Sequence, residues 1–148
     1  MNCVIDPTED MGGLYIGDII STIKEGVMES GNIQALLTCN FEENHFHTNC
    51  RKDIKLETKI IDCKDNLDYP IEMHFPATYN FIENNRIARK NVLVNCHAGK
   101  SRSGTILVAY LIKKNKWTAE RALNFVRNKR ERVKPNNGFW EKLVQYEK

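Results

Sequence analysis

The sequence lacks the segments that would place a protein in or across a membrane. None of its apolar runs approaches the roughly 18 residues that a membrane-spanning helix needs. The first residues, Met1 to Val4, do not form the basic and then apolar start of a secretory signal, and Asn2 stands where N-myristoylation needs glycine. The net charge of +3 is too small to indicate nucleic-acid binding by itself. We therefore expect a cytoplasmic protein, with the nucleus as a second location, that has no membrane span and binds no nucleic acid.

The sequence also lacks paired cysteines. Its five cysteines are widely spaced and include no C-x-x-C pair: Cys3, Cys39, Cys50, Cys63 and Cys96. An odd number in this arrangement argues against a disulfide framework and against a zinc site. His45 and His47 precede Cys50 in the polar stretch 41–57, but four ligands at metal-binding spacing are absent, so a surface loop or hairpin is favoured. We expect no metal site.

No internal repeat, low-complexity tract or linker divides the 148 residues, and we expect one domain spanning residues 1–148. Short apolar runs rich in β-branched residues predict strands at 14–17, 33–38, 59–61 and 92–94. Helical patterns alternate with them, and their expected starts are marked by Asp18, Pro76, Ser103, Thr118 and Asn137. The alternation predicts an α/β three-layer sandwich, in which a twisted, mostly parallel central sheet is flanked by helices on both faces.

The residues that follow the fourth predicted strand combine a cysteine with an anion-binding loop. Cys96 stands at the carboxyl end of that strand, where open α/β sheets bind ligands. The loop 97–101, which contains Gly99, leads into a helix, so backbone N–H groups and the helix dipole favour an anion and a thiolate. Arg102 can bind two phosphate oxygens side by side. The pattern predicts phosphoryl transfer to the sulfur of Cys96.

Two other interpretations of this segment are weaker. Gly99-Lys100-Ser101 matches the end of the nucleotide-binding pattern G-x-x-x-x-G-K-[ST], but Val94 stands where its first glycine must be. A purely structural thiol beside a tight turn would not require Ser101 and Ser103 around the arginine, nor the amphipathic helix that follows.

The segment from Cys96 to Ser103 resembles the C-x5-R-[ST] signature of protein tyrosine phosphatases, and its A-G-x-S-R-S form resembles the dual-specificity branch. The resemblance extends over nearly the whole chain: residues 14–17 resemble the opening strand of that branch, 65–82 its general-acid loop and following helix, and 136–139 the start of its closing helix. It implies a tyrosine-phosphatase-like fold. It also implies a protein phosphatase that hydrolyses phosphotyrosine and phosphoserine or phosphothreonine through a phosphocysteine intermediate.

The resemblance also implies roles for individual residues. The phosphate would be bound by His97, Ala98, Gly99, Lys100, Ser101 and Arg102. Asp62, Asp65 and Asp68 are candidates for the general acid, and residue type alone does not choose among them; the family register, ten residues before Phe75, selects Asp65. Ser103 would donate a hydrogen bond to the departing thiolate. No cofactor is implied, because Arg102 and the backbone N–H groups supply the countercharge.

One residue departs from the family pattern. Members usually have histidine immediately before the nucleophile, and here that residue is Asn95. An asparagine can donate and accept hydrogen bonds but has no positive charge. We therefore expect less thiolate at Cys96 and slower turnover, and a pseudophosphatase-like module that binds phosphorylated ligands stays open as an alternative.

The expected partners are phosphorylated proteins, with one alternative. His97 and Lys100 inside the loop resemble the branch that acts on phosphoinositides and phosphatidylglycerophosphate, so an acidic phospholipid or another non-protein phosphate is the alternative substrate. No sequence feature fixes the oligomeric state. Basic residues gather late in the chain: Lys113, Lys114, Lys116, Arg127, Lys129, Arg130, Arg132 and Lys134. Solvated helix ends are the favoured interpretation, and a docking surface for acidic or phosphorylated partners is the alternative.

Overall fold

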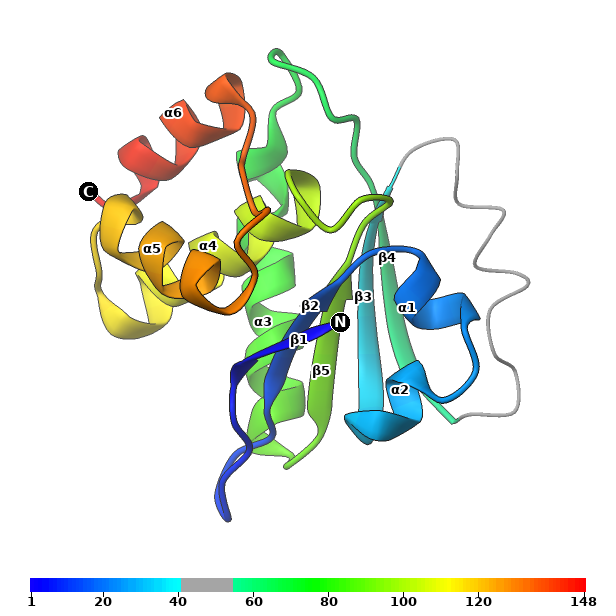
Figure 1. The fold of residues 1–148 in the computed structure, drawn as a ribbon. Helices are drawn as coiled ribbons and strands as arrows, with labels where there is room; N and C mark the ends of the chain where they lie inside the picture. Colours follow the sequence, from blue (N-terminus) through cyan, green and yellow to red (C-terminus); the bar gives the residue numbers. More distant parts are fainter. Residues whose placement is uncertain (41–54) are drawn as a thin grey trace.

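A five-stranded sheet forms the centre of the molecule (Figure 1). The computed structural model describes residues 1–40 and 55–148, so the segment with His45, His47 and Cys50 lies outside the described residues. The strands are β1 (Asn2–Ile5), β2 (Leu14–Gly17), β3 (Ile33–Asn40), β4 (Glu57–Asp62) and β5 (Asn91–Asn95). Their order is β1-β2-β5-β3-β4; β1 is antiparallel to β2 and the other neighbours are parallel. The predicted mostly parallel α/β sheet is confirmed.

Four of the five described strands were predicted, including β4, of whose six residues only Ile61 is buried. Every residue of β5 is buried, which explains its continuous apolar run. The edge strand β1 was not predicted, because only Val4 of its four residues is buried and its sequence therefore shows no hydrophobic alternation.

Helices cover the two faces of the sheet unequally (Figure 1). They are α1 (Ile20–Ile23), α2 (Val27–Ser30), the 3-10 helix η2 (Ile71–His74), α3 (Phe75–Ile87), α4 (Arg102–Asn115), α5 (Ala119–Lys129) and α6 (Asn137–Tyr146). On one face α3 and α4 pack on the strands, with α5 and α6 against α4. On the other face, Met28 of the short α2 packs on Leu36 and Leu93. Among the described helices, none is long and apolar enough to cross a bilayer.

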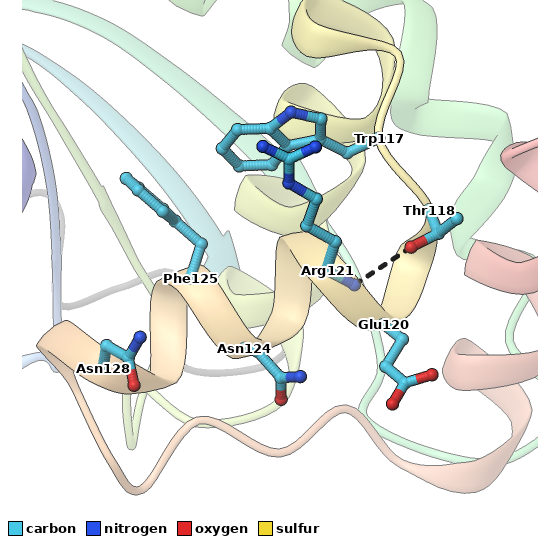
Figure 2. Close-up of a pocket in the computed structure, with 7 residues that line it drawn as sticks. All are labelled: Trp117, Thr118, Glu120, Arg121, Asn124, Phe125 and Asn128. Carbon is cyan, nitrogen blue, oxygen red and sulfur yellow. Dashed lines mark hydrogen bonds between the residues drawn. The ribbon is translucent and has the colours of Figure 1, made fainter.

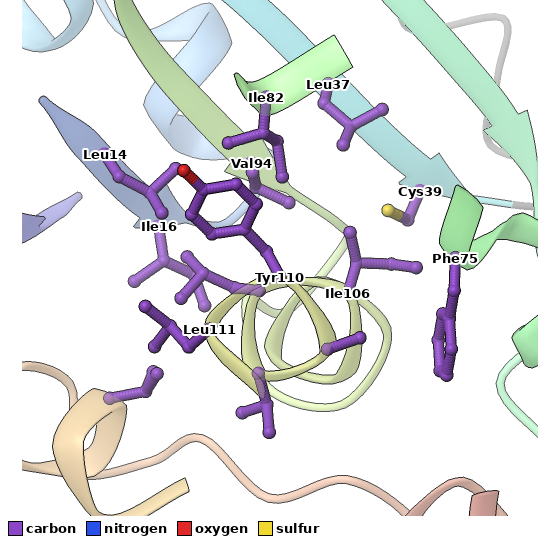
Figure 3. Close-up of a cluster of buried hydrophobic side chains, with 14 of the residues drawn as sticks. Leu14, Ile16, Leu37, Cys39, Phe75, Ile82, Val94, Ile106, Tyr110 and Leu111 are labelled. Carbon is purple, nitrogen blue, oxygen red and sulfur yellow. The ribbon is translucent and has the colours of Figure 1, made fainter. Parts of the chain in front are cut away.

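The main core lies between the sheet and α4 (Figure 3). Ile16 and Val94 project from the strands towards Ile106 and Leu111 of α4, and all four side chains are fully buried. Because α4 is surrounded by the sheet and three other helices, almost its whole length is buried. The helix that follows the cysteine loop is thus fixed within the core.

The helix caps agree with the prediction in part. Thr118 caps α5, since its hydroxyl accepts a hydrogen bond from the Arg121 N–H at 3.2 Å, and Pro76 lies in the first turn of α3 as expected. The predicted cap of α6, Asn137, is wrong by one residue: the Asn136 side chain accepts from the Phe139 N–H at 2.9 Å. Two adjacent asparagines offer the same capping chemistry, so the sequence pattern did not separate them.

The helix expected to run from Asp18 towards Gly26 is shorter than predicted. Asp18 does accept a hydrogen bond from the Ser21 N–H at 3.1 Å, but α1 ends at Ile23. Gly26 has a φ of +88° and begins the separate helix α2. The left-handed turn at Gly26 is what divides the segment into two short helices.

Candidate active site

The candidate site lies at the carboxyl ends of the central parallel strands. Asn95, the last residue of β5, pairs with Gly17 of β2 and with Thr38 of β3, so the loops that leave these strands meet at one edge. Cys96 follows directly, and its exposed fraction is 3%. The sheet therefore delivers the predicted nucleophile to the edge where ligands bind in such folds.

The five backbone carbonyls of residues 97–101, which we call the phosphate loop, all accept hydrogen bonds from surrounding groups. The donors are Ile19 N for His97 (3.1 Å), Arg130 Nη2 for Ala98 (3.4 Å), Arg130 Nε for Gly99 (2.9 Å), Lys134 N for Lys100 (2.9 Å) and Thr105 N for Ser101 (2.9 Å). In a trans peptide the C=O and N–H groups point in opposite directions. The N–H groups of residues 98–102 are therefore expected on the inner side of the loop, an arrangement that can bind an anion.

Gly99 makes the tight course of this loop sterically feasible. Its φ is +63°, and a Cβ atom at this residue would lie 2.6 Å from the Gly17 carbonyl oxygen. The left-handed backbone disfavours a side chain, and the close approach leaves no room for a Cβ atom unless the loop shifts. The predicted role of Gly99 as a loop former thus has a specific structural cause.

Ser103 lies beside the sulfur of Cys96. It is fully buried in the first turn of α4, and its Oγ is 3.1 Å from Cys96 Sγ. A hydroxyl at this distance can donate a hydrogen bond to a thiolate. The structure brings these two predicted residues together.

Arg102 joins the phosphate loop to the segment that follows β4. It is the first residue of α4 and is 8% exposed, and its Nη1 donates to the Cys63 carbonyl at 3.1 Å. Cys63 is followed two residues later by Asp65. The predicted phosphate ligand is therefore tied to the chain segment that carries the predicted acid.

Asp65 is exposed at the side of the phosphate loop. It lines a pocket of about 320 Å³ together with Lys100, Ser101 and Lys134, and of the three candidate aspartates it alone does so in the described part of the chain. Asn136 orients it: the Asn136 side-chain N–H group donates to the Asp65 carboxylate at 3.0 Å, while the Asn136 backbone N–H donates to Ser101 Oγ at 3.0 Å.

Asn95 uses its amide to tie two strand ends together. The Thr38 hydroxyl donates to Asn95 Oδ1 at 2.7 Å, and Asn95 Nδ2 donates to the Asp18 carbonyl at 3.2 Å. The side chain is 1% exposed and neutral. It can hold the loop in place as a histidine would, but it brings no charge to the site.

Comparison with known proteins agrees with this geometry. Residues 14–148 match the family model described as the catalytic domain of dual specificity phosphatases. The chain belongs to the dual specificity phosphatase family. It is 35% identical to dual specificity protein phosphatase 1 of Arabidopsis thaliana over 92% of this chain and 66% of the relative. It is 32% identical to the human dual specificity protein phosphatase 4, over 95% of this chain and 36% of the relative.

The chain thus spans less than two thirds of the length of each of these two relatives.

Solved structures share the fold. The crystal structure of DUSP15 superposes with a TM-score of 0.82 at 28% identity, covering 95% of this chain and 86% of that one. The human tyrosine phosphatase-like serine/threonine/tyrosine-interacting protein superposes with a TM-score of 0.88 at 24% identity, covering 99% and 95%.

Two further thiols lie near Cys96 in this dual specificity phosphatase domain. Burial raises the pKa of Cys39 well above its ordinary value. Burial likewise raises the pKa of Cys63, to about 12, although Arg102 acts in the opposite direction. Both therefore stay protonated at neutral pH, and a protonated thiol is a poor nucleophile.

Sequence reasoning missed two residues that shape the site, Arg130 and Asn136. Arg130 was grouped with the solvated late basic residues, and for Arg130 this prediction is wrong: it is 8% exposed and donates to the phosphate loop. The seven other residues of that group are exposed, as the favoured interpretation predicted. No local pattern separates Arg130 from Lys129 or Arg132, because its partners are distant in the sequence.

A separate surface hollow lies on α5, away from these residues. It measures about 550 Å³ and is lined by Trp117, Arg121 and Phe125 among others. The Arg121 guanidinium stacks over the Trp117 ring at 4.4 Å (Figure 2). None of the predicted site residues lines this hollow.

Proposed function

We propose that this chain is a protein phosphatase that hydrolyses phosphotyrosine and phosphoserine or phosphothreonine through a phosphocysteine intermediate on Cys96. One observation supports this most directly. The sulfur of Cys96 lies at the base of a loop whose carbonyls are all held outwards, with the hydroxyl of Ser103 at 3.1 Å. Such a site binds a phosphate dianion and stabilises a thiolate facing it.

In the first step the phosphate is bound by the inward N–H groups of residues 98–102 and by the guanidinium of Arg102. The Cys96 thiolate attacks phosphorus, so that an S–P bond forms while the bond from phosphorus to the leaving oxygen breaks. Asp65, in its protonated form, gives its proton to that oxygen and becomes a carboxylate. The dephosphorylated residue then leaves.

In the second step the Asp65 carboxylate takes a proton from a water molecule, whose oxygen attacks the phosphocysteine. The S–P bond breaks, inorganic phosphate is released, and the electron pair returns to Cys96 as a thiolate. Ser103 stabilises that departing thiolate by a hydrogen bond. The same nest serves both steps, since the charge develops on the same phosphoryl oxygens.

Hydrolysis of an aryl phosphate tests the proposal. We expect Cys96→Ser to lower kcat by about 10³-fold or more, because serine lacks a thiolate. Cys3→Ser is the matched control, since Cys3 lies on β1 with its thiol directed to Asp6, and it should keep the wild-type rate. Equal rates for the wild type and Cys96→Ser would contradict the proposed enzymatic activity. They would favour a module that only binds phosphorylated ligands.

A second candidate substrate class is favoured by the pocket beside Asp65. The exposed Lys100 and Lys134 both line this pocket, and their ammonium groups can pair with a second phosphate on the substrate. A phosphoinositide or another non-protein phosphate presents such a group. Turnover of phosphopeptides and of phosphoinositides should be measured in parallel. A value of kcat/KM more than about tenfold higher for the lipid, worth about 1.4 kcal/mol, would contradict the proposal that the substrates are proteins.

A further inference from the structure

The guanidinium of Arg130 lies buried against the outer side of the phosphate loop. Arg130 follows the last residue of α5. Its Nε donates to the Gly99 carbonyl at 2.9 Å and its Nη2 to the Ala98 carbonyl at 3.4 Å. One side chain thus fixes the orientation of two consecutive peptide groups of the loop. The N–H groups of these peptides, at Gly99 and Lys100, point away from Arg130.

Two further contacts hold the same guanidinium. Arg130 Nη1 donates to Asn2 Oδ1 on β1 at 2.7 Å, and Nη2 lies 3.8 Å from the carboxylate of Asp18, directly after β2. The side chain is therefore fixed on both sides. It connects α5, β1 and the end of β2 to the loop that surrounds Cys96.

Arg130 also brings a positive charge to this part of the molecule. Burial and Arg132 lower the pKa of the guanidinium, while Asp18 and Cys96 raise it, and an arginine with these neighbours stays charged at every working pH. The amino group of Met1 lies within the influence of Arg130 and Asp18.

We propose that Arg130 is a positioning residue that holds the phosphate loop open for an oxyanion. This inference rests on the proposed function of Cys96 as the nucleophile. It assigns to a residue 34 positions after the cysteine the orientation of two peptide groups of the loop.

The test compares Arg130→Gln, Arg130→Lys and the matched control Arg127→Gln, which replaces an exposed arginine of α5. Two quantities are measured on the full chain. One is the free energy of unfolding from urea denaturation, and the other is the inhibition of aryl phosphate hydrolysis by orthovanadate.

Folding and the shape of the loop should be affected separately. Arg130→Gln and Arg130→Lys both lose the paired hydrogen bonds to the Ala98 and Gly99 carbonyls. We expect both variants to weaken inhibition by orthovanadate about tenfold while the chain remains folded. Arg127→Gln should change neither quantity.

Unchanged inhibition by orthovanadate in folded Arg130→Lys would overturn the inference, and this variant decides alone if Arg130→Gln does not fold. These results differ from failure of the proposed function, which would appear as equal hydrolysis by the wild type and Cys96→Ser.

Discussion

Cys96 is as buried as the neighbouring thiols but differs from them in the polar groups that surround its sulfur. Cys39 and Cys63 are buried like Cys96, and burial raises the pKa of each of these two thiols. Cys96 instead faces the Ser103 hydroxyl and the loop N–H groups. The same residue type thus serves as core filling at two positions and as the candidate nucleophile at the third.

Asp65 should matter most for substrates with poor leaving groups. We expect Asp65→Asn to lower kcat for phosphoserine peptides by about 10²-fold and for an activated aryl phosphate by much less, because an alkoxide needs the proton more than a stable phenoxide does. Asp68→Asn is the matched control, being an exposed aspartate three residues away that does not line the pocket. A loss in Asp68→Asn as large as that in Asp65→Asn would contradict the assignment.

Among the individual site residues, the sequence predicted those that lie close together along the chain. Cys96, Arg102 and Ser103 fall within eight positions, and the turn into a helix brings them together. Asn136 and Arg130 could not be predicted in the same way, because their contacts with Asp65 and Gly99 span 71 and 31 positions. Only the tertiary fold decides which of many polar side chains reaches the loop.

The shape of the phosphate loop is held by the strands and helices that surround it. The loop runs so close to β2 that the Gly17 carbonyl fills the space in which a side chain at Gly99 would lie. Its carbonyls are held by donors from α4, from the end of α5 and from the segments that follow β2 and α5. Its shape therefore depends on several elements at once.

Replacing Gly99 should disturb this element more than replacing a glycine with a similar backbone. We expect Gly99→Ala to lower the free energy of unfolding by about 1–3 kcal/mol and to reduce kcat/KM about tenfold or more, since the loop must move away from Gly17. Gly26→Ala is the control: its φ is +88°, but no described atom lies within 4 Å of the place that its Cβ would take, so only the backbone strain remains. Urea denaturation and aryl phosphate kinetics measure both. An active Gly99→Ala with the stability of Gly26→Ala would contradict the steric argument.

Element boundaries were predicted where a local signal fixes them. The cap at Thr118 and the proline near the start of α3 act within one turn and were found. The cap at Asn136 was not found, because the adjacent Asn137 offers the same capping chemistry. The division of the segment after Asp18 into α1 and α2 was not found either, because Gly26 was interpreted as the end of one helix and is in fact the cap before a second. The edge strand β1 owes its place to pairing with β2 and not to its own hydrophobic pattern.

Across the whole molecule, a partly buried polar network ties α3 to α4 behind the sheet. Arg86 donates to the Gly12 carbonyl and to the Tyr110 hydroxyl, each at 2.8 Å, and Tyr110 donates to Glu83 at 2.6 Å. Burial alone would raise the pKa of Glu83, but hydrogen bonds from Lys114 and Tyr110 outweigh it and hold this pKa below its ordinary value. The sequence pattern predicted both helices but not this network, because polar residues on a helix usually face solvent.

The lowered pKa of Glu83 makes part of the stability depend on pH. Stability from this carboxylate is present above the ordinary pKa of glutamate and is lost as pH falls through the lower folded-state value. We expect Glu83→Gln to lower the free energy of unfolding by about 1–2 kcal/mol near pH 7, a difference that shrinks as the pH falls below the ordinary pKa of glutamate. Glu57→Gln, which removes an exposed ion pair with Lys90, should have a much smaller effect. Urea denaturation at several pH values measures this; a difference for Glu83→Gln that does not change with pH would contradict it.

The outward carbonyls of the phosphate loop have a consequence for how far the site can be separated from its protein. A peptide that copied residues 91–115 would contain the cysteine, the arginine, the serine and every inward N–H group. It would lack Ile19, Arg130 and Lys134, whose donors turn those peptide groups the right way. The phosphate pocket is therefore not portable with its signature sequence, and a graft into another scaffold would have to bring these distant donors with it.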